Sequence, residues 1–153
     1  MNQTEVDAYN RKEIREVVKA FKAMNETAID EARKVSGALA EYALGKIQAA
    51  AGTRTVSQKV ASRIADGGKV SKTSKIGEIS LGFASQKFSG GATTKTLWGG
   101  MEFGSNRFKQ FPNRTPRYRK GNVGYFIYPT LKAAQPHIIN EWQIAFDKIL
   151  KEF

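Results

Sequence analysis

A long run of helical periodicity at residues 10–50 limits the folds open to this chain more than any other feature. Apolar or small residues recur there at steps of three or four, broken once by Asn25, at Ile14, Val18, Phe21, Ala28, Ala32, Val35, Leu39 and Tyr42. This spacing places them on one face of an α-helix. The run predicts one long N-terminal helix of about 60 Å. It is either a core helix with a solvated back or one that also contacts a neighbouring subunit.

Shorter patterns beyond this helix predict a small sheet and a second long helix. A short helix is expected after the Thr55–Gln58 capping box, and Asp66-Gly67-Gly68 is expected to end it. Strands are expected at the alternation of Ile79, Leu81 and Phe83, at residues 97–104 (alternatively a tight turn) and at residues 123–128. Pro129 ends the last strand and is one candidate start of the last helix, and Pro136 is the expected first residue of a main helix that runs to about Glu152. The predicted fold class is α+β, with a small antiparallel sheet packed against a long N-terminal helix and a C-terminal helix.

The length of 153 residues suits a single domain, 1–153, with residues 1–9 as a loose N-terminal arm and 105–122 as an exposed basic loop. The chain has no cysteine, which excludes disulfides and thiolate metal sites. Its first residues do not resemble a secretory signal, and no apolar run has the length of a membrane span. We therefore expect synthesis in a cytoplasm and no membrane partner.

Positive charge is concentrated in the second part of the chain. Residues 1–50 hold eight basic and eight acidic residues, whereas residues 51–153 hold seventeen basic and six acidic ones, so the net charge of +11 all lies after the long helix. This asymmetry indicates a polyanionic partner, which would be nucleic acid, a membrane surface or an acidic protein face.

The basic loop is the candidate partner-binding or DNA-binding site. Its candidate residues are six bases and three interleaved aromatics, namely Arg107, Lys109, Arg114, Arg117, Arg119, Lys120, Phe108, Phe111 and Tyr118. Arginines can fork onto phosphates or carboxylates, and aromatic rings can stack on a partner. The alternative is a solvated cationic loop whose aromatics fold back onto the core. Any DNA contact would be to the backbone and independent of sequence, because no recognition-helix pattern is present.

Catalytic equipment is not visible in the sequence. His137 is the single histidine, and no spacing pairs Asp66, Glu78 or Glu102 as an acid and a base. Residues 90–96 resemble a phosphate-binding loop, but that motif requires glycine directly before the lysine, where Thr94 stands. A flexible connection is the better interpretation. We expect no enzyme activity, no catalytic residues, no cofactor and no metal.

Two short motifs resemble a known family. Met101-Glu102-Phe103-Gly104-Ser105 is similar to the "V-E-F-G-T/S" signature of the head–tail joining or minor tail components of long-tailed bacteriophages. Phe126-Ile127-Tyr128-Pro129-Thr130-Leu131 resembles the "P-F-L-R-P-A-L" run that leads into the last helix of that family. The chain departs from the pattern at Gly124-Tyr125, where the family often has proline, and at Tyr128, where it commonly has arginine.

The resemblance implies a structural virion protein of the phage neck, made in the bacterial host cytoplasm. It would be a head–tail connector or tail-completion subunit that forms a sixfold or twelvefold ring between the capsid connector and the tail tube. Implied partners are copies of itself, neighbouring head-connector and tail proteins, and the DNA backbone in the channel. Glu102, beside Trp98 and Phe103, would need a partner, for which we expect an arginine of the basic loop. The alternative function is sequence-nonspecific nucleic-acid binding.

Overall fold

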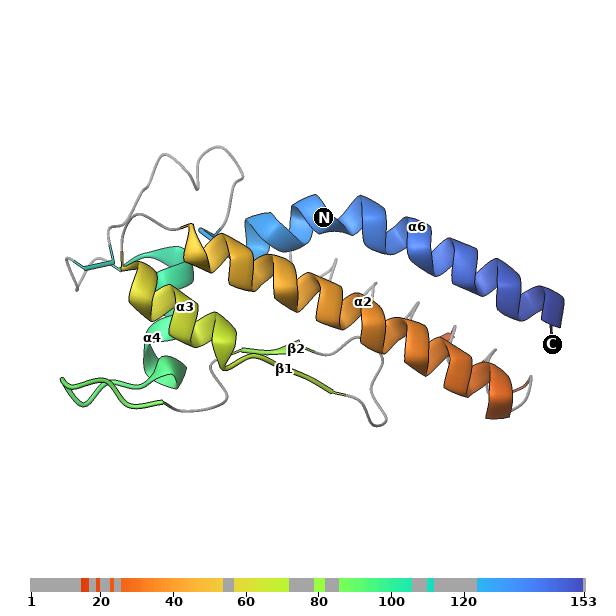
Figure 1. The fold of residues 1–153 in the computed structure, drawn as a ribbon, viewed down its shortest axis with the longest axis horizontal. Helices are drawn as coiled ribbons and strands as arrows, with labels where there is room; N and C mark the ends of the chain where they lie inside the picture. The colour runs from red at the N-terminus through yellow and green to blue at the C-terminus, as the bar shows by residue number, and fades with distance from the viewer. Residues whose placement is uncertain are drawn as a thin grey trace.

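Two long antiparallel helices form the frame of the molecule in the computed structural model, and the smaller elements gather at one end of this pair (Figure 1). Helix α2 spans Glu26–Gly52 and helix α6 spans Tyr128–Glu152. We call the end with the smaller elements the proximal end and the opposite end, near the C-terminus, the distal end. The structure describes residues 15–16, 19, 23, 26–53, 57–71, 79–81, 86–105, 110–111 and 124–152.

The buried face of α2 follows the periodicity expected from the sequence. Its buried positions are Ala28, Ala32, Ser36, Leu39, Ala40, Ala43, Ile47 and Ala51, at steps of mostly three or four residues. Most of these side chains are small, so α6 can pack closely against this face. Arg15, Glu16, Lys19 and Ala23 are also helical. The predicted N-terminal helix is therefore confirmed over residues 26–50, while the loose arm at residues 1–9 lies outside the described residues.

The core has a large proximal cluster and a small distal one. The proximal cluster combines residues from α2, α3, α4 and the start of α6, including Ile47, Ile64, Met101 and Phe126. The distal cluster consists of Ala28, Ala32 and Ile149, with Ile29, Trp142 and Phe146 packed against it. The distal cluster joins the first turns of α2 to the last turns of α6, and thereby holds the helix pair together along its length.

A short helix and a two-stranded sheet follow α2. Helix α3 spans Gln58–Asp66 and ends at Gly67, as the glycine pair in the sequence predicted. Strand β1 (Lys69–Val70) pairs with strand β2 (Ile79–Ser80) in antiparallel register, with Lys69 opposite Ser80. The sheet packs against α2, and Leu81, just after β2, lies in the same core as Leu131 of α6. The fold is α+β and mostly helical.

Helix α4 (Thr94–Phe103) corrects the expectation of a strand or tight turn at residues 97–104. Thr93 and Thr96 form a reciprocal capping box at its start. Gly99 and Gly100 suggested an extended or turning backbone, but the helix uses Gly100 for close packing. A Cβ atom at Gly100 would lie 2.7 Å from the Phe111 ring. Gly100 has a low helix propensity, but its contact with Phe111 explains why a glycine occupies this helical position.

Helix α6 begins at Tyr128, beside Pro129, the earlier of the two expected starts, and not at Pro136. Residues 125–127 form a bend rather than the predicted strand, and the helix runs continuously from Tyr128 through Pro136. Pro136 was expected to mark the start of the main helix, because an interior proline removes one helical N–H donor. The helix instead starts one turn after Gly124, where a side chain from α4 binds its first N–H groups.

Candidate functional site: the Glu102 clamp and the apolar recess

Glu102 is a fully buried carboxylate that binds the start of α6. It lies in the last turn of α4 with 0% of its surface exposed. Its Oε2 accepts hydrogen bonds from the N–H groups of Phe126 and Ile127, both at 2.9 Å, and its Oε1 accepts one from the Tyr128 N–H at 2.8 Å. A buried charge is costly unless such donors compensate it. We call this arrangement the Glu102 clamp.

The clamp places a negative charge at the positive end of the α6 dipole. The first N–H groups of a helix have no partner within the helix, and charge-assisted hydrogen bonds to a carboxylate are among the stronger ones in proteins. Pro129 has no N–H to satisfy, so its place in the first turn costs no hydrogen bond. The Thr130 hydroxyl adds a bond to the Phe126 carbonyl at 2.5 Å. The start of α6 is thus set by α4.

Gly124 is the backbone position that makes room for the clamp. Its φ is +87°, in the region that favours glycine, and a Cβ atom there would clash with the Glu102 carboxylate. The residue is buried. Gly124 therefore serves two needs at once, the sharp turn into α6 and the close approach of a charged side chain.

The two motifs that carry the family resemblance meet at this point. Glu102 belongs to the first motif, and the three N–H groups that it binds belong to Phe126, Ile127 and Tyr128 of the second. The expected partner of Glu102 was an arginine of the basic loop. The structure gives the carboxylate three backbone N–H partners, and the arginines of the basic loop lie outside the described residues, so that the expectation stays a prediction.

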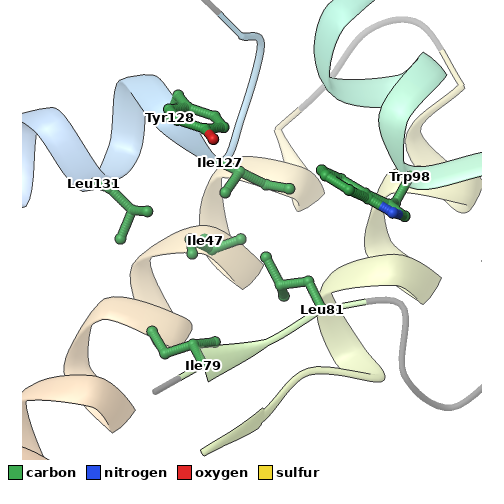
Figure 2. Close-up of a pocket in the computed structure, with 7 residues that line it drawn as sticks. All are labelled: Ile47, Ile79, Leu81, Trp98, Ile127, Tyr128 and Leu131. Atoms are coloured by element: carbon green, nitrogen blue, oxygen red, sulfur yellow. The ribbon is translucent and has the colours of Figure 1, made fainter. Parts of the chain in front are cut away.

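An apolar recess of about 310 Å³ lies beside the clamp, between α2, β2, α4 and α6. Its lining consists of Ile47, Ile79, Leu81, Trp98, Ile127, Tyr128 and Leu131. In Figure 2 the side chains of Ile47 and Ile127 lie in the middle, and the remaining five lining side chains surround them. Trp98 is 36% exposed and Tyr128 is 46% exposed, so two large aromatic side chains stand at its edge. An exposed apolar surface of this kind is typical of an interaction site.

The clamp and the recess share their supporting residues. Trp98 is one helical turn before Glu102 on α4, and Tyr128 contributes both a clamped N–H and a lining side chain. Phe103 lies between the two aromatics, with ring centroids 6.2 Å from Trp98 and 5.5 Å from Tyr128. The carboxylate therefore fixes the two helices that carry the aromatic edge of the recess.

Most of the predicted loop site lies outside the described residues. This applies to Arg107, Phe108, Lys109, Arg114, Arg117, Tyr118, Arg119 and Lys120. Phe111 is described, and it corrects the expectation of an exposed partner-binding side chain. Its ring is 2% exposed and packs in the proximal core. For this one residue, the alternative of an aromatic that folds back onto the core is the correct one.

The segment that resembles a phosphate loop, residues 90–96, is divided between a hairpin turn that ends at Thr93 and the first turn of α4. The Phe88 N–H donates to the Ala92 carbonyl at 2.8 Å, and Lys87 pairs with Thr93 in an antiparallel bridge. Arg63 of α3 holds this turn, since its guanidinium donates to the Lys87 carbonyl at 3.0 Å and lies 4.1 Å from the centre of the Phe88 ring. Gly91, with φ +84°, forms part of a tight turn rather than a phosphate cradle.

The remaining candidates for chemistry are dispersed. His137 is exposed on α6, with its ring 4.5 Å from that of Tyr42. Among the described residues, no three His, Cys, Asp or Glu side chains group so that they could hold a metal ion. Sequence patterns did not predict the recess, because its lining residues come from four separate elements. Only the alternation at Ile79 and Leu81 and the bulky residues near Trp98 hinted at it.

Within the described part of the chain, no helix combines the length and apolarity that crossing a bilayer requires. No protein-family model matches the chain, and comparison with curated proteins and with solved structures finds no match either.

Proposed function

We propose that this chain is a structural virion protein of the bacteriophage neck, a ring-forming subunit that connects the capsid connector to the tail tube. The observation that carries the proposal is the Glu102 clamp. Two short sequence motifs, each of which is weak by itself, are joined in space by three hydrogen bonds to one carboxylate. Their direct contact supports the view that they form one functional unit rather than two chance resemblances.

The surface beside the clamp supports a role in assembly. The recess is apolar and its edge exposes Trp98 and Tyr128, residue types that are common at the centres of protein interfaces. The clamp holds these aromatics on two rigid helices. A preorganised apolar surface lowers the entropic cost of association, which suits a subunit that docks many times in one particle.

The location of the chain in the particle tests this function. We propose to delete its coding sequence from the phage genome that encodes it and to image the products by electron microscopy. The expected result is DNA-filled heads and separate tails, with joining restored when the chain is supplied from a plasmid. Tailed particles that form normally without the chain would contradict the neck function.

Binding to duplex DNA distinguishes the alternative function. A free nucleic-acid-binding protein with this charge would bind duplex DNA at low salt, and its affinity would fall steeply with salt, by about 0.9 in log–log slope for each phosphate neutralised. Strong binding together with normal head–tail joining in the deletion mutant would favour the alternative. A joining defect with weak duplex binding would support the neck function.

A further inference from the structure

The molecule has an apolar recess at its proximal end and exposed apolar side chains between the middle and the distal end of α6. Ile139, near the middle of the helix, is 47% exposed and Leu150, in its last turns, is 52% exposed. Phe146 lies between them on the same side of the helix, since the spacing is seven and then four residues, but it is only partly exposed because it packs against the distal cluster. We call Ile139, Phe146 and Leu150 the α6 stripe. Ile144, 57% exposed, lies farther round the same helix.

The α6 stripe cannot fill the recess of its own copy. Leu131, which lines the recess, and Leu150 belong to one continuous helix. The separation of nineteen positions, 150 − 131, corresponds to about 28 Å of helix. An occupant from this stripe must therefore come from a second copy of the chain.

Charge on the two ends favours such a contact over a symmetric one. Among the described residues, the proximal end (α3, β1, residues 86–105, the last turns of α2 from Lys46 and the first turns of α6 to Ala134) carries seven basic and two acidic residues. The distal end (residues 26–34 of α2 and 142–152 of α6) carries four basic and five acidic residues. Two proximal ends would repel each other, whereas a proximal and a distal end attract.

We propose that the α6 stripe of one copy docks into the apolar recess of the next copy, so that the subunits associate head to tail. A helix face with apolar residues at this spacing suits a groove lined by aliphatic and aromatic side chains. Such a heterologous contact closes into a ring when its rotation divides a full turn evenly. The proposal deepens the neck function by naming the subunit contact, and it rests on that function only for ring closure.

Disulfide trapping tests the contact directly, because the chain has no cysteine of its own. We propose two single-cysteine variants of the full chain, Lys132→Cys beside Leu131 at the recess and Lys151→Cys beside Leu150 in the stripe. Both positions are exposed, and both changes remove the same charge. Lys59→Cys, exposed on α3, is the matched control. The proteins are mixed at about 1 mM, where even a contact with a Kd near that value is populated, and mildly oxidised.

The expected result is a preference for the mixed pair. The mixture of Lys132→Cys with Lys151→Cys should give about tenfold more linked dimer than either variant alone or than Lys59→Cys with Lys151→Cys, a ratio that corresponds to about 1.4 kcal/mol. Adding Leu150→Ser to the Lys151→Cys variant should remove the preference. Equal yields, no linked dimer, or an excess of either self-pair would overturn the proposal. The same results are expected if another part of the chain or a different protein occupies the recess.

The neck function and the head-to-tail contact can each be refuted without refuting the other. If the mixed pair is trapped but particles without the chain join heads to tails normally, the head-to-tail contact stands and the neck function fails. If the chain is essential for joining but no pair is preferred, the neck function stands and this contact fails.

Discussion

At the scale of single residues, one carboxylate connects segments that are distant in the sequence. Glu102 is buried beside apolar side chains, yet its two oxygens accept three backbone N–H bonds. These bonds replace the water that an ionised carboxylate would otherwise require. Gly124 completes the arrangement because only a residue without a Cβ atom fits against the carboxylate at positive φ. Stability should therefore be unusually sensitive to these two positions.

Replacing the carboxylate should destabilise the fold in proportion to the number of acceptors removed. Glu102→Gln keeps the shape but turns an amide NH₂ toward backbone donors, and should lower the free energy of unfolding by about 2–3 kcal/mol. Glu102→Ala, which leaves three donors unsatisfied and a cavity, should lower it by about 3–5 kcal/mol. Urea denaturation measures both changes. Asp66→Asn, at an exposed acid, is the control and should change little. Equal stabilities of Glu102→Gln and the parent chain would show that the clamp is unimportant.

A methyl group at Gly124 should be as harmful as the loss of a clamp bond. Gly124→Ala combines an unfavourable positive φ with a clash against Glu102, and should cost about 2–4 kcal/mol in the free energy of unfolding. Thermal unfolding followed by circular dichroism checks this value. Gly91→Ala is the matched control, because Gly91 also has positive φ, of +84°, but has open space around its Cβ position. If both variants lose the same stability, strain alone explains the effect and the close approach of Glu102 contributes nothing.

At the scale of elements, α6 is a long helix with a proline, Pro136, in its interior. Pro136 lies eight residues after its start at Tyr128 and provides no N–H for the helical bond to Lys132. The helix persists because its first turn is held by Glu102 and its later turns pack on α2. Packing against α2 and the clamp together outweigh the local cost of the proline.

Removing the proline should therefore stabilise the chain. Pro136 is exposed, so Pro136→Ala restores a helical hydrogen bond without removing a core contact and should raise the free energy of unfolding by about 1–3 kcal/mol. Chemical denaturation with unchanged circular dichroism per residue is the measurement. Gln135→Ala, next to it and also exposed, is the control and should have an effect of only a few tenths of a kcal/mol. A loss of stability in Pro136→Ala would mean that α6 needs the proline for its path along α2.

At the scale of the whole molecule, charge and apolar surface are distributed unevenly. The described proximal end is basic and holds the recess, and the segment between Phe111 and Gly124 adds further bases to the chain. Assembly by repeated docking would use this polarity, because a molecule with two different ends associates in one direction. The basic residues between 105 and 122 would then face either an acidic neighbouring ring or DNA.

Neutralising part of the basic loop separates folding from assembly. Changing Arg114, Arg117 and Arg119 together to Ala should leave the melting temperature within a few degrees, while the yield of joined particles falls by about tenfold if the three arginines together contribute about 1.4 kcal/mol to docking. Plaque counts and electron microscopy of a complemented deletion mutant give the yield. The control changes Arg15, Lys19 and Lys34 to Ala, which removes the same charge from exposed helical positions. Normal joining by the loop variant would exclude the role proposed for the loop.

Local sequence patterns were enough to predict the long helical face of α2, the end of α3 at its glycine pair and the α+β class, because these follow from side-chain periodicity and local backbone preference. Long-range contacts account for the helix at residues 94–103, for the single continuous helix from Tyr128 through Pro136, for the burial of Phe111 and for the binding of Glu102 to backbone N–H groups. Each of these outcomes depends on a contact between segments far apart in the chain, which no local pattern encodes. The recess arises in the same way, from side chains that four separate elements bring together.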